Sequence, residues 1–307
     1  MPIRLLSLPG KDLQYALDCM DIRDLVAFSL CSERTKNLVK SSNRKIEPIA
    51  AYVYEDYIYF DLKTENDYDS TNDYISLYVF DSYFEFSGSL EIEEWRKEEF
   101  TQNDWIAHFL NIFNDPMIGY LGILNTSLSY LDTIKQLFPK CSRLAISDMF
   151  SRAFAKIAFW KLYSIAEKVE IYKNICDDKN DTSKLLTLSL KSLYLVDFVN
   201  PLKLNLDDLL ILNITDVTIH FANISVKELN RFLKLWMQGN RTFYRPEVIS
   251  LCLENGTQLN YEEVLKGIKY ENVKNYYRDF TLFRLKRRDG KELNVFIADN
   301  EFTFRVV

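Results

Sequence analysis

Residues 4–45 read RLLSLPGKDLQYALDCMDIRDLVAFSLCSERTKNLVKSSNRK, a stretch with three short helical patterns in succession. The first pattern covers residues 9–20, where Leu13, Leu17 and Met20 recur at the spacing of one helix face. Three helices of about ten residues each bury too little apolar surface to be stable alone. The sequence therefore predicts that this block either packs on the rest of the chain or is completed by another protein.

Capping residues mark where the second and third helices begin. Asp21 is placed to cap the second helix, with Asp24 at the capping-box position and Leu25 directed inwards. Ser32 is placed to cap the third helix, which presents Leu38 to the same core.

The whole chain has 307 residues, of which 48% are hydrophobic, 27% charged and 14% aromatic, as expected of an ordinary globular protein. This length is sufficient for two domains. Five scattered cysteines without CxxC spacing indicate reduced thiols and a cytoplasmic or nuclear location. The N-terminus lacks the pattern of a signal peptide, and no apolar stretch is long enough to span a bilayer, so no membrane partner is expected.

Charge varies along the chain. Residues 1–47 carry a net charge of +2, residues 48–104 carry 3 basic and 15 acidic residues, and residues 105–307 carry a net charge of +4. An acidic middle segment opposes contact with phosphate backbones, so no nucleic-acid partner is expected and a solvated surface is favoured. We predict a three-helix domain, a β-rich acidic connecting segment and a repeat-like α/β domain with these boundaries.

The middle segment is predicted to form a two-stranded β element. Its two runs, YVYEDYIYFDLK and YISLYVFDSYFEF, are rich in Tyr, Phe, Ile and Val. The intervening loop, residues 64–73, contains Asp67, Asp69 and Asp73. It lacks the central Gly and closing Glu of a calcium loop, so an exposed loop is favoured and no metal is expected.

A repeat begins at about residue 105. Its short strands have an apolar-x-apolar pattern, and the first five are separated by 23, 25, 24 and 24 residues: Leu121/Ile123, Leu144/Ile146, Val169/Ile171, Leu193/Leu195 and Val217/Ile219, with a sixth around Leu251. Predicted helices lie between the strands. A strand–helix unit of this length predicts a leucine-rich-repeat-like solenoid, with a compact α/β domain as the alternative.

The end of the chain combines a strongly amphipathic helix with strands. Residues 224–239 carry a capping box, an unbroken apolar stripe and a C-terminal Gly239. Three strands follow, and Asp289-Gly290 between the first two predicts a hairpin. The basic residues around this turn, such as Arg287, are compatible with a nuclear signal, but protection of a sheet edge is favoured.

The sequence shows no catalytic or cofactor motif. Its two histidines, His108 and His220, have no Cys, Asp or His nearby at metal-ligand spacing, and His108 is predicted on the polar side of its helix. There is no GxSxG elbow and no phosphate-binding glycine loop. We therefore expect neither an enzyme, nor a cofactor, nor a small-molecule substrate.

Residues 6–39, LSLPGKDLQYALDCMDIRDLVAFSLCSERTKNLV, resemble an F-box. The resemblance rests on an entry Leu-Pro, on apolar residues at helical spacing and on a closing Ser-Leu-Cys-Ser run: Leu8, Pro9, Leu13, Leu17, Met20, Leu25, Ser29, Cys31, Ser32 and Leu38. Gly10 and Thr35 depart from the usual acidic residue and tryptophan.

A subgroup of F-box proteins accommodates these departures, since its F-boxes continue as SLCSxxTKxLVK, which residues 29–40 match. That subgroup carries an F-box-associated domain of type two, whose hallmark resembles DDLLxLN followed by ISxxxLNxFLKxW. This chain has DDLLILN at 207–213 and ISVKELNRFLKLW at 224–236. The expected fold is therefore α+β or α/β: a small three-helix F-box, then a leucine-rich-repeat-like α/β domain with flanking β-hairpins.

The resemblance implies a non-catalytic substrate receptor of a Skp–cullin–F-box ubiquitin ligase. Its F-box would bind a Skp-type adaptor, and through it a cullin, while the C-terminal domain would bind an unidentified target protein. The residues expected at the adaptor are Leu8, Pro9, Leu13, Leu17, Met20 and Leu25. Leu17 and Leu25 are equally compatible with holding the three helices together.

Strand alternation predicts a face for the target. If the apolar pairs of the repeat point into the core, the residues beside them point out of the sheet. These are Lys168, Glu170, Tyr172, Ser192, Tyr194, Asp216, Thr218 and His220.

Two alternatives stay open. The chain is also compatible with an F-box scaffold that binds the adaptor without directing degradation. The second alternative is an adaptor-independent, repeat-type interaction module whose N-terminal helices mimic the motif.

Overall fold

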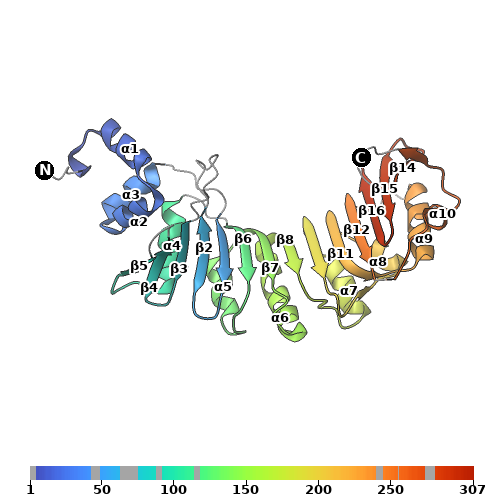
Figure 1. Cartoon of the computed structure of the whole chain (residues 1–307), viewed down its shortest axis with the longest axis horizontal. Helices are drawn as coiled ribbons and strands as arrows, with labels where there is room; N and C mark the ends of the chain where they lie inside the picture. The colour runs from blue at the N-terminus through green and yellow to red at the C-terminus, as the bar shows by residue number, and fades with distance from the viewer. Residues whose placement is uncertain are drawn as a thin grey trace. The chain divides into compact units, whose positions relative to one another are not determined.

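The structure is a computed structural model that describes residues 5–42, 49–62, 75–87, 92–113, 118–239, 245–254, 256–273 and 281–307. An N-terminal three-helix region is followed by mixed α/β sheet, as predicted (Figure 1). The chain divides into two compact units, Met1–Arg143 and Leu144–Val307, and the boundary falls within strand β7 (Cys141–Ile146). The predicted acidic loop at residues 64–73 lies outside the described residues.

The first unit opens with the predicted helices. They follow a short 3₁₀ turn and have these bounds: η1 (Leu5–Ser7), α1 (Gly10–Cys19), α2 (Ile22–Leu30) and α3 (Glu33–Ser41). Asp21 caps α2 as predicted, because its carboxylate accepts the Asp24 N–H at 2.7 Å, but the Asp24 side chain does not complete a capping box among the described residues. Ser32 and Thr35 form a reciprocal capping box at the start of α3.

The acidic segment forms more strands than predicted. The strands of the first unit are β1 (Ala50–Val53), β2 (Ile58–Leu62), β3 (Ile75–Val79), β4 (Tyr83–Ser87), β5 (Ile92–Arg96) and β6 (Ile118–Ile123). The prediction of a two-stranded element is wrong, because each aromatic run turns back on itself, at residues 54–57 and again at residues 80–83. Strands β1 to β5 pair antiparallel in chain order, and β1 pairs parallel with β6.

Two helices, α4 (Gln102–Ile112) and α5 (Leu131–Leu137), complete this unit. Helix α4 lies on the face of the sheet that carries Phe84, whose ring centroid is 4.7 Å from that of Trp105 and 5.2 Å from that of Phe109. All three rings are almost fully buried. The core of this unit is therefore aromatic, and α4 also contacts α2 and α3.

His108 joins the three-helix region to α4, and its prediction on the polar side of the helix is wrong. The side chain is 6% exposed, and its Nε2 lies 2.8 Å from the Ser29 hydroxyl on α2. The Ser29 hydroxyl donates its proton to the Val26 carbonyl at 2.6 Å, so His108 Nε2 carries the hydrogen and donates to Ser29. Burial, together with Lys36 and Lys97, lowers the pKa of His108 to about 4.

This depressed pKa predicts a stability that depends on pH. In the unfolded chain His108 takes up a proton near its usual pKa of 6.5, whereas the folded chain binds it only near 4. The contribution of neutral His108 is therefore complete above pH 6.5 and is lost as the pH falls towards 4, by on the order of 2 kcal/mol. Urea unfolding across this range should show the loss in the wild type. In His108→Gln the free energy of unfolding should change less steeply with pH over the same range. Equal slopes in the variant and the wild type would show that His108 is not the source of the pH dependence.

The second unit contains most of the predicted repeat, whose first strand, Leu121/Ile123, is β6 of the first unit. Its helices and 3₁₀ turn are α6 (Arg152–Leu162), η2 (Tyr163–Ile165), α7 (Lys179–Leu186), α8 (Leu206–Leu210), α9 (Val226–Met237) and α10 (Tyr261–Val264). The repeat strands are β8 (Ala166–Ile171), β9 (Ser192–Val196), β11 (Asp216–Asn223) and β12 (Val248–Leu253). The short strand β10 (Leu202–Lys203) lies between β9 and β11 in the sequence. Strands β8, β9, β11 and β12 are neighbours and all parallel, which confirms the repeat strands at these positions.

Antiparallel strands close this unit beyond β12. They are β13 (Glu271–Val273), β14 (Thr281–Lys286), β15 (Glu292–Ala298) and β16 (Glu301–Val306), in the spatial order β12-β16-β15-β14-β13. The hairpin at Asp289-Gly290 is confirmed, with Gly290 at φ +90°. Helix α9 packs on β16, since Phe232 and Trp236 both contact the Phe304 ring.

Arg287 has a structural role beside this hairpin. Its guanidinium lies 4.8 Å from the centre of the Trp236 ring and donates to both Asp289 carboxylate oxygens, at 2.8 and 2.5 Å. This hydrogen bonding holds the pKa of Asp289 well below its usual range. Arg287 is buried, and it therefore fastens the hairpin to α9.

Candidate adaptor-binding and target-binding surfaces

The six residues predicted at the adaptor fall into two groups. Leu17 and Leu25 are each 1% exposed and form the core of the three helices. The other four lie before α1, within it and at its C-cap, with part of their surface open: Leu8, Pro9, Leu13 and Met20. Part of the apolar surface of the three-helix region is therefore exposed.

Two further apolar residues of this region are exposed and were missed by the sequence analysis. Leu6 is 40% exposed and Tyr15 is 73% exposed. Tyr15 is two residues from Leu13, so it falls off the apolar stripe used to find the helix, and its exposure was visible only in the structure.

The eight residues predicted to contact a target lie on one face of strands β8, β9 and β11. Glu170 and Thr218 both pair with Tyr194 in the ladder, and Lys168 and Asp216 both pair with Ser192. The side chains on this face are all partly exposed, and the residues that alternate with them are buried. The alternation argument therefore places all eight together.

An aromatic row crosses this face. The ring centroids of Tyr172 and Tyr194 are 6.0 Å apart, and those of Tyr194 and His220 are 5.2 Å apart. The Tyr172 hydroxyl donates to Glu170 at 3.2 Å. Burial and the neighbouring Glu170 raise the pKa of Tyr194, so its phenol remains a hydrogen-bond donor at neutral pH.

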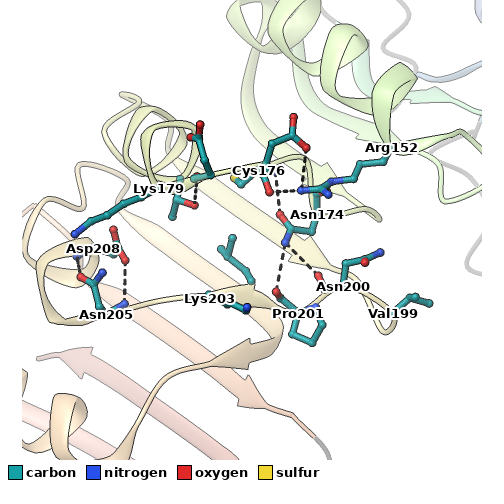
Figure 2. A pocket seen from close by; sticks show the side chains of 14 residues that line it. Arg152, Asn174, Cys176, Lys179, Val199, Asn200, Pro201, Lys203, Asn205 and Asp208 are labelled. Atoms are coloured by element: carbon teal, nitrogen blue, oxygen red, sulfur yellow. Dashed lines mark hydrogen bonds and ion pairs between the residues drawn. The ribbon is translucent and has the colours of Figure 1, made fainter.

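A pocket that the sequence analysis did not find opens beyond the carboxyl ends of β8 and β9. It has a volume of about 530 Å³, and Figure 2 shows its lining side chains. Arg152, Asn174 and Asn200 lie on one side, and Lys179, Asn205 and Asp208 lie on the other. Ligands of parallel α/β sheets commonly bind at this edge.

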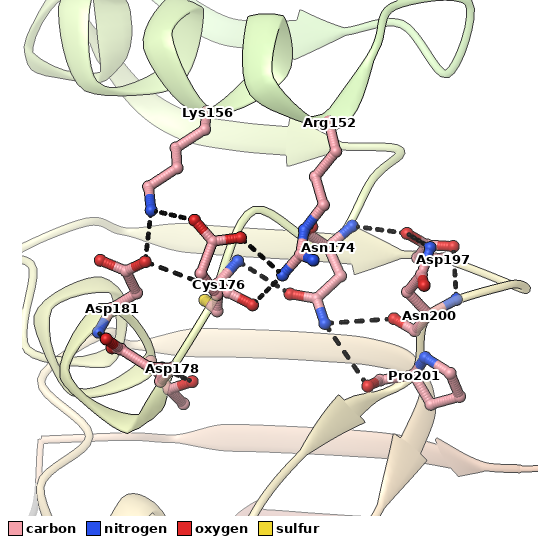
Figure 3. Close-up of polar contacts among 11 residues, drawn as sticks. Arg152, Lys156, Asn174, Cys176, Asp178, Asp181, Asp197, Asn200 and Pro201 are labelled. Atoms are coloured by element: carbon pink, nitrogen blue, oxygen red, sulfur yellow. Dashed lines mark hydrogen bonds and ion pairs between the residues drawn. The ribbon is translucent and has the colours of Figure 1, made fainter.

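Asn174 and Asp197 organise the pocket wall (Figure 3). The Asn174 side chain donates to the carbonyls of Asn200 at 3.1 Å and Pro201 at 3.4 Å, and accepts the Cys176 N–H at 3.0 Å. Asp197 accepts the backbone N–H groups of Asn174, Val199 and Asn200, each at 2.9 Å. Two loops that follow different strands are thereby held as one surface.

The charges beside this wall are largely compensated. Arg152 pairs with Asp177 at 3.1 Å, and Lys156 pairs with Asp177 at 2.6 Å and with Asp181 (Figure 3). The hydrogen bonds to Asp177 and Asp181 raise the pKa of Lys156 to about 12. Burial alone would raise the pKa of Asp197, but its backbone N–H donors lower it, so it is ionised at neutral pH.

The pocket offers hydrogen bonds rather than a nucleophile. Burial raises the pKa of the Cys176 thiol to about 11, so the thiolate is scarce at neutral pH. Within the described ranges, no three His, Cys, Asp or Glu side chains lie close enough to share a metal ion. The arrangement fits recognition of a polar group better than bond-breaking chemistry.

Asp208, the second aspartate of the DDLL motif, belongs to the capping box at the start of helix α8. Its Oδ2 accepts the Asn205 N–H at 2.9 Å in a capping box that starts α8, and the side chain is 2% exposed. Burial raises the pKa of Asp208. Its Oδ1 is enclosed and has no hydrogen-bond partner among the described residues.

The role of Asp197 yields a stability prediction. Asp197→Ala leaves three backbone N–H groups without their acceptor and should lower the free energy of unfolding by about 2–3 kcal/mol. Asp197→Asn keeps one acceptor oxygen and should cost about half as much. Urea unfolding measures both values, and amide hydrogen exchange at Val199 and Asn200 should accelerate in Asp197→Ala. An unchanged exchange rate there would show that Asp197 does not hold the loop.

Residues 5–47 match the family model of the F-box domain, and residues 181–242 match the model described as F-box associated. The chain carries an F-box domain and an F-box associated domain. It is also similar to the F-box associated domain-containing protein sdz-33 of Caenorhabditis elegans, with 22% identity over 317 residues that cover 96% of this chain and 94% of the relative. No solved structure matches the chain.

The two matches cover the candidate surfaces. The F-box domain contains η1 and α1 to α3, and with them every residue predicted at the adaptor. The F-box associated match contains β9, β11 and α9, most of the predicted target face and the Asn205–Asp208 side of the pocket. In the part of the chain that the structure describes, no helix has the length and apolar character needed to cross a membrane.

Proposed function

We propose that this chain is the substrate-recognition subunit of a Skp–cullin–F-box ubiquitin ligase. The observation that carries the proposal is an F-box domain whose apolar residues Leu8, Pro9, Leu13 and Met20 keep exposed surface. Burial of that surface by a Skp-type adaptor would remove apolar area from water and enlarge the core that Leu17 and Leu25 already form.

The target-binding role falls to the predicted domain at residues 105–307. Its support is the half-exposed face of β8, β9 and β11 next to a polar pocket, which together offer aromatic rings and hydrogen-bonding groups. The leucine-rich-repeat-like solenoid stays part of this proposal, and its support is the parallel strand–helix repeat. The chain contributes no acid, base or nucleophile, and acts by holding a target near a charged ubiquitin-conjugating enzyme in the cytoplasm or nucleus.

Reconstitution tests this function. The purified full chain, a Skp-type adaptor and a cullin are mixed, and size-exclusion chromatography is expected to yield one complex that contains all three. Failure to bind the adaptor would overturn the proposal in favour of an adaptor-independent module. Adaptor binding without cullin recruitment would indicate a non-degradative scaffold.

A further inference from the structure

The sheet of the first unit has a second face, opposite α4, that is rich in partly exposed aromatic side chains. Along β1 to β4 the residues that point away from α4 are partly exposed, and their neighbours in the sequence are buried against the helices. We call six of these outward side chains the tyrosine face: Tyr52, Tyr57, Tyr59, Tyr78, Phe80 and Tyr83. None of them was singled out from the sequence.

The rings of the tyrosine face form one continuous layer across four strands. Tyr59 pairs with Tyr52 on one side and with Tyr78 on the other, at centroid distances of 5.4 and 5.0 Å. Tyr57, Phe80 and Tyr83 continue the layer at 5.4 and 4.5 Å. These contacts stabilise the sheet, but they leave the outer surface of the rings open.

Gly122 on β6 makes room for this layer. A Cβ atom at this position would lie 2.9 Å from the Tyr52 ring, closer than atoms in contact allow. The missing side chain leaves room for the Tyr52 ring beside β6. The layer therefore depends on a close approach between β1 and β6.

The tyrosine face is surrounded by negative charge. Asp61, Glu85 and Glu94 lie on the same face of the sheet, and Glu55, Asp56 and Asp81 lie exposed at the two turns beside it. Burial raises the pKa of Tyr52 and Tyr78, and the charges of Asp61 and Glu85 add to the respective shifts. Among the described residues of 49–104, the two basic residues are Arg96 and Lys97, and Lys97 lies over the Phe100 ring.

Arg96 shows which group this face accepts. Its guanidinium lies 4.9 Å from the centre of the Tyr83 ring and forms a salt bridge with Glu94. A planar guanidinium can stack on an aromatic ring and pair with a carboxylate at the same time, whereas the compact ammonium of lysine does this less well. Several further rings and carboxylates on this face have no such cation among the described residues.

We propose that the tyrosine face binds an arginine-rich segment of a target protein. The tyrosine face is a different surface from the β8–β9–β11 face, and the proposal rests on the proposed receptor function. The rings stack on guanidinium groups, and the surrounding carboxylates pair with them. A nucleic acid is disfavoured as occupant because its phosphates meet carboxylates here.

Peptide binding to the full chain tests this inference. The probe is a fluorescent peptide of alternating glycine and arginine, compared by anisotropy with two peptides of the same length that carry citrulline or lysine in place of arginine. The arginine peptide should bind about tenfold more tightly than the citrulline peptide and measurably more tightly than the lysine peptide. Equal binding of arginine and lysine peptides would indicate charge attraction alone and would overturn the proposal.

Variants locate the site. The double substitution Tyr59→Ser and Tyr78→Ser should weaken arginine-peptide binding about tenfold, whereas Phe at both positions keeps the rings and should retain it. Glu85→Gln should weaken binding about threefold, and Glu98→Gln, an exposed charge outside the face, should not change it. If both Phe and Ser variants bind like the wild type, the peptide binds elsewhere and the inference fails.

Two controls separate the outcomes. Adaptor capture, measured in parallel, reports on the receptor function, so peptide binding without adaptor capture would overturn the proposed function and leave the tyrosine face as a peptide site. Light scattering of the free chain reports self-association. A dimer that the Ser variant dissociates would identify a second copy of this chain as the occupant instead.

Discussion

Replacing Leu8 and Pro9 together by alanine is expected to weaken binding of a Skp-type adaptor by at least about 100-fold while the chain stays folded. Both residues precede or cap α1 and keep exposed surface, so their side chains contribute to a partner more than to the chain's own core. A few such anchor residues commonly carry most of the affinity of an interface. Surface plasmon resonance with the immobilised adaptor measures the change.

Two matched variants make this result interpretable. Met149→Ala removes an apolar side chain that is 84% exposed in the second unit and should leave adaptor affinity unchanged. Leu17→Ala removes a fully buried side chain and should lower stability as well as affinity. Wild-type affinity in the Leu8 and Pro9 variant would show that the adaptor uses another surface.

Trp105→Ala is expected to have the largest effect on stability, about 3–5 kcal/mol. Trp105 is 1% exposed and contacts Phe84 and Phe100 edge-on, each at a centroid distance of 4.7 Å. Its loss leaves a cavity under α4, the helix that also supports α2 and α3. Chemical unfolding gives the free energy, and hydrogen exchange of α4 and β4 shows where the structure loosens.

Trp105→Phe is the informative control. The indole Nε1–H has no hydrogen-bond partner among the described residues, so a phenylalanine removes an unsatisfied donor while it keeps much of the buried ring. It should cost less than about 1.5 kcal/mol. Trp160→Ala, at a partly exposed position in the second unit, should leave hydrogen exchange of α4 unchanged. A similar loss in Trp105→Phe and Trp105→Ala would show that the indole makes a contribution that a phenyl ring cannot replace, and would contradict this prediction.

The alternation of apolar and polar residues predicted the positions of the repeat strands correctly, but it gave too few strands in the aromatic segment of the first unit. The strands around Val169, Leu193 and Val217 were placed correctly because each is a short apolar pair between polar residues. The aromatic runs of the first unit were predicted as one strand each, although each forms two. Their turns contain no glycine or proline, and the weaker turn signals at Asp56 and at Asp81-Ser82 lie inside aromatic runs that read as continuous strands.

Side-chain environment was less predictable than strand position. His108 was assigned to a polar helix side because its helical neighbours did not reveal that Ser29, 79 residues earlier, would cover it. The pocket wall depends on a bond from Asn174 N–H to Asp197, 23 residues later, between two loops whose separate sequences read as ordinary turns. Neither contact has a signature within one helix turn or one strand.

The sequence by itself determined where the helices start and which strand residues face the core, since Asp21, Ser32 and Ser225 act on N–H groups three residues away. Such interactions form within one turn of the chain and require no partner from elsewhere. The tertiary structure alone decided that Tyr52, Tyr59 and Tyr78 share one layer, and that Asn174 and Asp197 share one wall. These neighbours arise from strand pairing and loop packing over long separations, where the chain must first close its loops before the contacts can form.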